Sequence, residues 1–396
     1  MDRTAGGMPP TKVRKKTPPR RLGVGDLPDG ALQRVLSLLP AQEAVRTCVL
    51  ARRWCHTWKS AAGLIILCGG ETRRKFADRL LRARGATPVD TCEFRLLELD
   101  KDDAHRIDLW IRHVLHCKVR VLRLNNVHIG WQPPHEYVPA DLPLISQHLK
   151  KLQLENIPIH SNGFLEFSSC PVLEDLEIRN CDLFYADRLF SQSLKRLTID
   201  RCIFCYDEPM EICAPNLVSL WLQDICILYG CILDFLGCPA LEDLVICNCD
   251  LSVDQGCSTP SLQGTPSLVG AVIKVNNNDC GWGHAQYWPR TDLKFYPTFN
   301  KLKTLLLNEY WCEPPDFSAL ASILEHSPVL EKLTLQLYSE GRKHNVEIKL
   351  SCKPMEKSAA ISEHLSVVEI KSEALDERVS NVLKFLGKLN IWFQFS

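Results

Sequence analysis

Apolar residues between Val24 and Ser60 recur at the spacing of short amphipathic helices. Pro28 suits the first turn of the first helix, and Pro40 cannot continue it. Four apolar residues between them stand at positions i, i+3, i+4 and i+7, on one helix face: Leu32, Val35, Leu36 and Leu39. The same spacing predicts a second helix with Val45, Cys48 and Val49 and a third with Trp54 and Trp58. Three helices of this length bury little among themselves, so their apolar surface needs another partner.

That partner is either the rest of this chain or a second protein. Packing on the same chain is the ordinary outcome for an amphipathic helix. It would require complementary apolar residues in the adjacent predicted helix, residues 71–85. That helix is instead crowded with cationic side chains: Arg73, Arg74, Lys75, Arg79, Arg82 and Arg84. Its composition favours a second protein as the partner.

An L-x-x-L-x-L-like core repeats from Val119 to Tyr338. Two copies, residues 170–183 and 238–251, differ at only three of fourteen positions. The second strand residue of each copy is Leu124, Leu154, Ile178, Ile199, Leu222, Ile246, Leu307 or Leu335. Between Leu154 and Ile246 the spacings are 24, 21, 23 and 24 residues, which is the period of leucine-rich repeats. Each short strand alternates apolar with polar residues, so stacked copies should form a parallel sheet on the inner face of an arc.

Asparagine follows the strand in several copies: Asn125, Asn156, Asn180 and Asn248. Its side-chain amide can satisfy backbone groups where the chain turns. Two stretches interrupt the regular spacing of the repeats. Residues 125–148 hold Trp131 and four prolines, and residues 252–298 hold Trp282, Tyr287 and Trp288 among polar residues. The second stretch is either a loop that helps to recognise a partner or a disordered excursion.

The segments that flank the repeats carry their own patterns. Phe76, Leu80 and Leu81 indicate a helix that Gly85 ends, and residues 92–96 alternate like a strand. A further helix is indicated by Ile107, Trp110, Ile111, Val114 and Leu115. Near the C-terminus a strand at 367–370 precedes a helix with Val379, Val382, Leu383 and Leu386 on one face, and a last apolar strand follows. Such an end can cap the exposed core of a repeat array.

The residue order of the N-terminal segment resembles the F-box, in its plant form. Leu-Pro-Asp is followed by a leucine-rich helix, by Leu-Pro, and by AVRTCVLARRW. The resemblance implies that this segment inserts into the Skp-type adaptor of a cullin–RING ubiquitin ligase. Carried over position by position, it implies a contact lined by Leu27, Pro28, Leu32, Val35, Leu36, Leu39, Pro40, Val45, Val49, Leu50 and Trp54. The family usually has Ser before the Arg-Trp pair, where this chain has Ala51 and Arg52. The C-terminal segment looks like the FBD module that often follows plant F-box and leucine-rich repeats.

Together, pattern and resemblance predict an α/β chain: a small three-helix F-box, a curved leucine-rich-repeat solenoid with a parallel sheet on its inner face, and a C-terminal α/β cap. The expected parts are a disordered basic tail (1–21), the F-box (22–62), linker helices and a first strand (63–118), the repeats with a long insert near 252–298 (119–358), and the FBD-like cap (359–396).

Composition narrows the function classes. The chain has 47 Lys and Arg against 47 Asp and Glu, so it shows no global bias toward nucleic acid. No window reaches the roughly 18 consecutive apolar residues of a membrane span, and the basic N-terminus lacks the apolar region of a secretory signal. We expect the 19 cysteines to act as small apolar side chains in a reducing compartment. Cys202 and Cys205 have CxxC spacing, but no second pair lies at the distance that a zinc site needs.

The basic stretch KVRKKTPPRR at residues 12–21 is either a nuclear-import signal or a solvated tail. We therefore expect the nucleus, the cytoplasm or both. Nucleic acid is not expected as a partner, because no folded basic surface accompanies the tail.

No catalytic motif is present: there is no G-x-S-x-G, G-x-x-x-x-G-K-S/T, H-E-x-x-H or post-strand G-x-G-x-x-G. His105, His113 and His116 share one predicted helix, but no nearby cysteine or acidic residue completes the spacing of a set of metal ligands. We expect no catalysis, no cofactor and no metal.

Two functions compete. In the first, the chain is a substrate receptor that binds the Skp-type adaptor, and through it cullin and RING subunits, while its repeats hold an unknown target protein. It would then act by proximity, without chemistry of its own. In the second, it is a leucine-rich-repeat scaffold that binds proteins and recruits no ligase.

Overall fold

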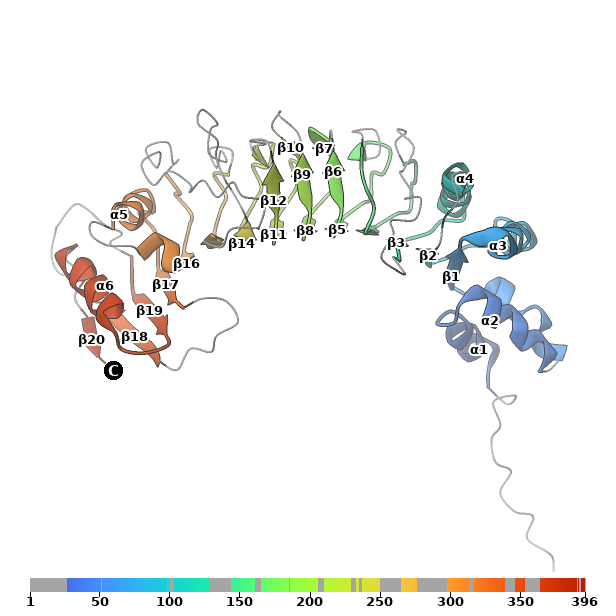
Figure 1. Cartoon of the computed structure of the whole chain (residues 1–396), viewed down its shortest axis with the longest axis horizontal. Coiled ribbons are helices and arrows are strands. Elements are labelled where there is room, and N and C mark those ends of the chain that lie inside the picture. Colours follow the sequence, from blue (N-terminus) through green and yellow to red (C-terminus); the bar gives the residue numbers. More distant parts are fainter. Residues whose placement is uncertain are drawn as a thin grey trace, which may run out of the picture.

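A computed structural model shows the chain as a long arc that carries a group of short helices at its N-terminal end (Figure 1). The structure describes residues 27–50, 52–97, 99, 103–127, 144–160, 165–184, 186–205, 210–228, 233–234, 237–249, 265–275, 298–312, 317–338, 346–352, 364–389, 391 and 393–395. The basic tail and the aromatic residues Trp131, Trp282, Tyr287 and Trp288 lie outside these residues. In the described part of the chain, no helix has the length and apolar character that crossing a membrane requires.

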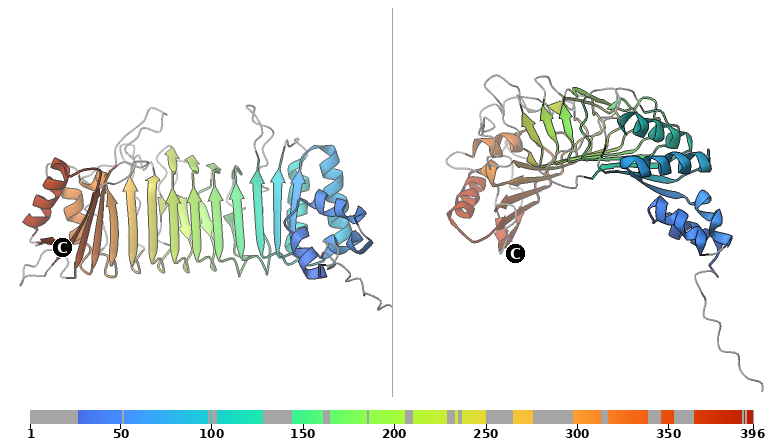
Figure 2. Two further views of the ribbon diagram at one scale, coloured as in Figure 1. Left: turned by 90° about the horizontal axis from the view of Figure 1, so that it is seen from below. Right: turned by 45° about the vertical axis from the view of Figure 1, so that its right-hand side comes forward.

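In the described residues, one large sheet of fourteen strands runs the length of the arc. Twelve strands follow one another in parallel: β1 (Gly63–Cys68), β2 (Thr91–Leu96), β3 (Val121–Asn126), β4 (Lys151–Glu155), β5 (Asp175–Arg179), β8 (Arg196–Asp200), β11 (Ser219–Gln223), β14 (Asp243–Cys249), β15 (Gly270–Val275), β16 (Thr304–Asn308), β17 (Lys332–Leu337) and β19 (Val367–Ser372). Beyond β19, β18 (Val346–Cys352) pairs antiparallel with β19 and with β20 (Phe393–Phe395). Figure 2 shows that this sheet lines the concave side of the arc, which we call the inner face.

The apolar residues predicted from the repeat pattern lie opposite one another in the sheet. Leu124 pairs in register with Leu154, and the ladder then runs through Ile178, Ile199, Leu222, Ile246, Ile273, Leu307, Leu335 and Ile370. All of these side chains are buried. Their neighbours along each strand point to the inner face, because successive side chains of a strand alternate between its two faces. The two-residue period of the sequence therefore separates core from inner face.

The residue at the turn after the strand has the same backbone conformation in several copies. Asn156, Asn180 and Asn248 have φ values of 56°, 51° and 54°, in the left-handed region that asparagine tolerates well. Arg201 and Asp224 occupy the same place in their copies and have φ values of 53° and 49°. Asn125 differs from the prediction, because it lies within β3 and its side chain donates to Glu155 Oε2 at 2.7 Å.

A second layer covers the convex side of the large sheet. It contains two three-stranded parallel sheets in the middle of the arc and helices toward its two ends (Figures 1 and 2). The small sheets are formed by β6 (Asp182–Phe184), β9 (Ile203–Cys205) and β12 (Cys226–Leu228), and by β7 (Arg188–Phe190), β10 (Met210–Cys213) and β13 (Leu233–Asp234). The helices are α3 (Gly70–Arg84), α4 (Asp103–His116), α5 (Ser318–Glu325) and α6 (Glu377–Lys388). The stacked rings of Phe317 and Phe385 join α6 to the residue that precedes α5.

Three expectations are corrected. The third helix, around Trp54 and Trp58, is instead a pair of short 3₁₀ turns. The stretch 252–298 contains a regular strand, β15, which continues the parallel ladder. The segment 63–118 holds two sheet strands, β1 and β2, and not one.

Cysteines fill equivalent buried places in the core. Cys181, Cys202 and Cys249 each follow the left-handed residue of their copy, and each thiol donates to a backbone carbonyl. Burial raises the pKa of Cys249 and of Cys312 to about 12. These thiols therefore stay protonated in the folded chain under conditions where an exposed thiol ionises.

Alkaline pH is expected to destabilise the fold through these thiols. Burial raises the pKa of Cys170 to about 11 from an ordinary value of 9.0, so its contribution is complete below pH 9 and is lost as the pH rises through 11. Between pH 8 and pH 10 the loss is about 1 kcal/mol for this thiol. Urea unfolding at both pH values should show a smaller decrease for Cys170→Ala than for the wild type. An equal decrease in both proteins would contradict this assignment.

Candidate functional site

The N-terminal module, residues 27–62, is built from α1 (Asp29–Leu36), α2 (Ala41–Arg46) and three 3₁₀ turns, η2 (Thr47–Val49), η3 (Arg52–Cys55) and η4 (Thr57–Ser60). Its own small core forms around Leu36, which packs with Ala44, Ala61 and the partly buried Leu39 and Trp58. Leu32 and Trp54 are also buried. Part of the apolar surface predicted from the sequence is therefore used inside the module.

The turns of the module are held by polar contacts. Arg53 Nη2 lies 2.6 Å from Asp29 Oδ1, which ties η3 to the first turn of α1. Cys48 Sγ donates to Cys55 O at 3.4 Å, and Cys55 Sγ donates back to Cys48 O at 3.6 Å. Burial raises the pKa of Cys48. These contacts brace the backbone on both sides of residues 49 and 50.

Four large apolar side chains of the module remain exposed. Val35 is 45% exposed, Leu38 75%, Val49 88% and Leu50 68%. In the whole described part of the chain, only four other large apolar side chains are exposed: Leu109, Ile145, Trp221 and Leu375. Half of this set thus lies within sixteen residues, from Val35 to Leu50. Clustered exposed apolar groups mark protein–protein contacts more often than isolated ones do.

The predicted adaptor contacts fall into three groups. Exposed residues are Pro28, Val35, Val49 and Leu50; half-buried residues are Leu27, Leu39, Pro40 and Val45; buried residues are Leu32, Leu36 and Trp54. In this conformation the buried three stabilise the module from within and offer little surface to a partner. The sequence interpretation missed Leu38, because this residue lies after the end of α1, where helical spacing no longer applies.

The module is attached to the edge of the large sheet. Gly63 N, at the start of β1, donates to Ser37 Oγ at 2.9 Å, and Pro40 forms a parallel bridge with Ile65. Arg84, at the end of α3, is buried, and its guanidinium donates to Trp58 O at 2.7 Å and to Ala61 O at 2.9 Å. Burial lowers the pKa of Arg84. The module therefore covers the first edge strand and is held there by several independent contacts.

The inner face is a second candidate surface. In its first half, on β3 to β5, charged and polar side chains pair with one another. Arg123 donates to Gln153, and Gln153 Nε2 donates to Glu177 Oε2 at 2.5 Å. Lys151 pairs with the same carboxylate, and Arg179 Nη2 lies 3.0 Å from it. Burial alone would raise the pKa of Glu177, but the hydrogen bonds from Lys151 and Gln153 hold it below its usual value.

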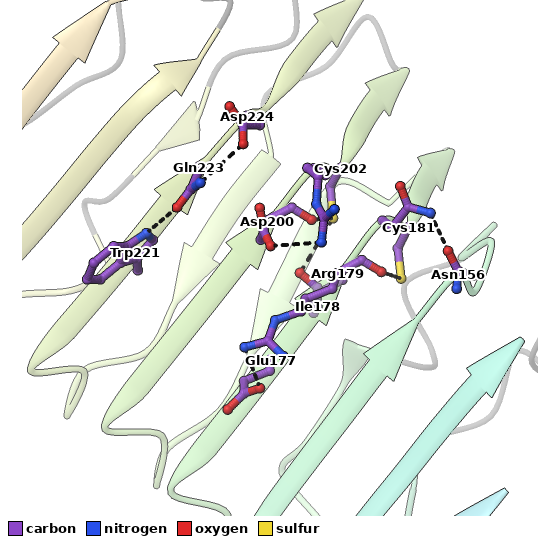
Figure 3. Close-up of polar contacts among 12 residues, drawn as sticks. Asn156, Glu177, Ile178, Arg179, Cys181, Asp200, Cys202, Trp221, Gln223 and Asp224 are labelled. Atoms are coloured by element: carbon purple, nitrogen blue, oxygen red, sulfur yellow. Dashed lines mark hydrogen bonds and ion pairs between the residues drawn. The ribbon is translucent and has the colours of Figure 1, made fainter. Parts of the chain in front are cut away.

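The second half of the inner face is different, because Trp221 on β11 stands exposed on it. Its indole Nε1 donates to Gln223 Oε1 at 3.3 Å, and Gln223 Nε2 donates to Asp224 Oδ2 at 3.2 Å (Figure 3). Asp200, on the neighbouring strand β8, lies on the same side of the sheet.

The described residues hold no cluster of three or more His, Cys, Asp or Glu that could bind a metal ion. Of the paired cysteines considered from the sequence, Cys202 is buried and its thiol donates to Asp200 O at 3.4 Å.

Comparison with known proteins finds a family match on the N-terminal module. The F-box domain family matches residues 25–62. The meiotic F-box protein MOF of Oryza sativa subsp. japonica is 28% identical over 356 residues, which cover 79% of this chain and 70% of that protein. An F-box/FBD/LRR-repeat protein of Arabidopsis thaliana is 27% identical over 372 residues, covering 83% of this chain and 79% of that protein. A putative F-box/LRR-repeat protein of the same plant is 29% identical over 242 residues, or 51% of this chain and 38% of that protein. The chain therefore carries an F-box domain and, over much of its length, is related to plant proteins named for an F-box, leucine-rich repeats and an FBD module.

Proposed function

We propose that this chain is the substrate-recognition subunit of an SCF-type (cullin–RING) ubiquitin ligase. Its N-terminal module would bind a Skp-type adaptor, which links it to the cullin and RING subunits. The observation that carries the proposal is the cluster of exposed apolar side chains, Val35, Leu38, Val49 and Leu50, on a segment that matches the F-box family. A module packed only against its own chain would bury these groups.

The remainder of the chain would serve as the target-binding part. The repeated strands and the second layer behind them would form a leucine-rich-repeat solenoid, and an FBD-like cap would close its C-terminal end. Such a concave sheet presents one side chain in two from each strand to a partner. Catalysis is not part of the proposal: the receptor raises the effective concentration of the target beside the ubiquitin-conjugating enzyme. The basic tail supports action in the nucleus, the cytoplasm or both.

Truncating two exposed residues of the cluster tests this proposal. Val49→Ala/Leu50→Ala should weaken binding to a purified Skp-type adaptor on the order of 100-fold, since each buried aliphatic side chain contributes roughly 1.5–3 kcal/mol and alanine retains part of it. Isothermal titration calorimetry measures the affinity directly. Because both side chains are largely exposed in the free chain, the thermal unfolding temperature should not change.

Two other exposed apolar residues provide the matched control. Leu109→Ala and Ile145→Ala remove exposed apolar side chains outside the N-terminal module and should leave adaptor affinity unchanged. If the folded wild-type chain does not bind the adaptor, the ligase proposal fails and the chain is a repeat scaffold. If the double variant binds as tightly as the wild type, the contact lies elsewhere.

A further inference from the structure

An apolar strip crosses the second half of the inner face. Trp221 on β11 pairs in register with Val245 on β14, Val245 with Val272 on β15, and Val272 with Leu306 on β16. Trp221 is 45% exposed, and the other three are half-buried. Four apolar residues in one row on four adjacent strands form a continuous surface, in contrast to the charged pairs on β3 to β5.

Two carboxylates border this strip. Asp200, at the end of β8, is paired only loosely: its Oδ2 lies 3.5 Å from Arg201 Nη2, and its buried Oδ1 accepts no hydrogen bond in the described structure. Asp243, at the start of β14, is exposed and stands on the same face as Val245. Its Oδ1 lies over Gly270, where an added Cβ would be 3.1 Å from that oxygen.

The nearby cations of the first half are already neutralised. Arg196 binds both carboxylate oxygens of Asp175, with 2.7 Å between Nη2 and Oδ2, and Arg179 is paired with Glu177. On the far side of the strip, Lys274 stands on the same face of β15 as Val272 and makes an interaction of its own within the chain. The side of the border on β8 and β14, which carries the two carboxylates, is therefore the side complementary to a positive charge. The face of Trp221 adds to this preference, because an aromatic ring attracts a cation as well as an apolar group.

We propose that this strip binds an extended segment of a target protein in which a lysine or arginine stands next to aliphatic or aromatic residues. Four strands spaced by about 4.8 Å give the strip a length of about 14 Å, which corresponds to four or five extended residues. Trp221 is the anchor, because exposed tryptophans that become buried contribute most to protein–protein affinity. Asp200 and Asp243 select the positive charge. This assignment deepens the proposed receptor function and rests on it.

Random peptide display on the folded full-length chain tests the proposal without knowledge of the target. Linear twelve-residue peptides are selected on the wild-type chain alone, and the enriched peptides are synthesised for fluorescence anisotropy. The enriched peptides should carry Lys or Arg within three residues of an aliphatic or aromatic residue. Their affinity should fall at least tenfold with Trp221→Ala and about three- to tenfold with Asp200→Asn or Asp243→Asn. Higher salt should weaken binding to the wild type more than binding to the Asp variants.

Leu109→Ala is the control and should bind the same peptides within twofold of the wild type. Failure to enrich any peptide, enrichment of acidic or uncharged peptides, or equal binding to Trp221→Ala each overturns the proposal. Circular dichroism of every variant separates loss of the site from loss of the fold. Adaptor affinity is measured on the same samples. A wild-type chain that binds peptides but not the adaptor contradicts the ligase role alone. A wild-type chain that binds the adaptor but no peptide contradicts the strip alone.

Discussion

Replacing Arg84 with methionine is expected to lower the free energy of unfolding by about 3–6 kcal/mol, because two hydrogen bonds from a charged donor, each contributing about 1.5–3 kcal/mol, are lost at once. The guanidinium donates to Trp58 O and Ala61 O, at the point where the N-terminal module meets the sheet. Methionine fills similar space but leaves both carbonyls without this donor. Lysine should rescue only part of the loss, because its single ammonium lacks the planar fork of arginine.

Urea unfolding and limited proteolysis measure this effect. The variant should be cleaved between the module and β1 under conditions that leave the wild type intact, since the junction opens before the sheet. Arg82→Met removes an exposed arginine from the same helix and should behave like the wild type. Equal stability of Arg84→Met and Arg82→Met would show that Arg84 does not hold the junction.

Gly63→Ala is expected to push the N-terminal module away from the sheet edge. A Cβ at this position would lie 2.7 Å from Ser37 O and 2.8 Å from Ser37 Cβ, closer than atoms in a packed interior can approach. Because a backbone carbonyl is one of the two groups, the strain cannot be relieved by a change of rotamer. We expect a loss of about 3 kcal/mol, at the upper end of the usual cost of overpacking.

The matched control is Gly30→Ala in α1, where an added Cβ meets nothing within 4 Å. Alanine is the better helix former, so this variant should be more stable than the wild type by about 0.5–1 kcal/mol. If the module packs on β1 as described, the thermal unfolding temperature rises for Gly30→Ala and falls for Gly63→Ala. A destabilised Gly30→Ala together with an unaffected Gly63→Ala would contradict this arrangement.

The ladder of buried residues could be predicted from the sequence because each strand hides one face only. Leu154, Ile178 and Leu222 recur at a regular interval, and an apolar residue at that place can be buried only by the next copy. The leucine pattern did not predict strand β15, and the reason is physical. Its copy reads Leu268, Ala271, Ile273, and alanine fills the buried place that leucine fills in most copies. A small residue packs there, but it does not produce a visible leucine period.

The exposed side of the N-terminal module was harder to predict, because short helices are apolar on more than one side. The spacing of Leu32, Val35 and Leu36 identifies a helix but not which of them faces its neighbours. The structure directs Leu32 and Leu36 inward and leaves Val35 exposed. The two 3₁₀ turns around Trp54 likewise break the helical spacing on which the prediction of a third helix depended. Which side of a short helix is buried depends on packing against distant parts of the chain. A local sequence pattern does not contain that information.

Hydrogen–deuterium exchange of the full-length chain, with and without a saturating Skp-type adaptor, shows whether the N-terminal module binds the adaptor and leaves the inner face free. We expect slower exchange in residues 27–50, which carry the exposed apolar cluster, and unchanged exchange in β11 and β14 on the inner face. The target-binding strip would then remain free in the assembled receptor. Unchanged exchange in residues 27–50, or protection of the inner strands by the adaptor, would show that the adaptor does not bind through the N-terminal module alone.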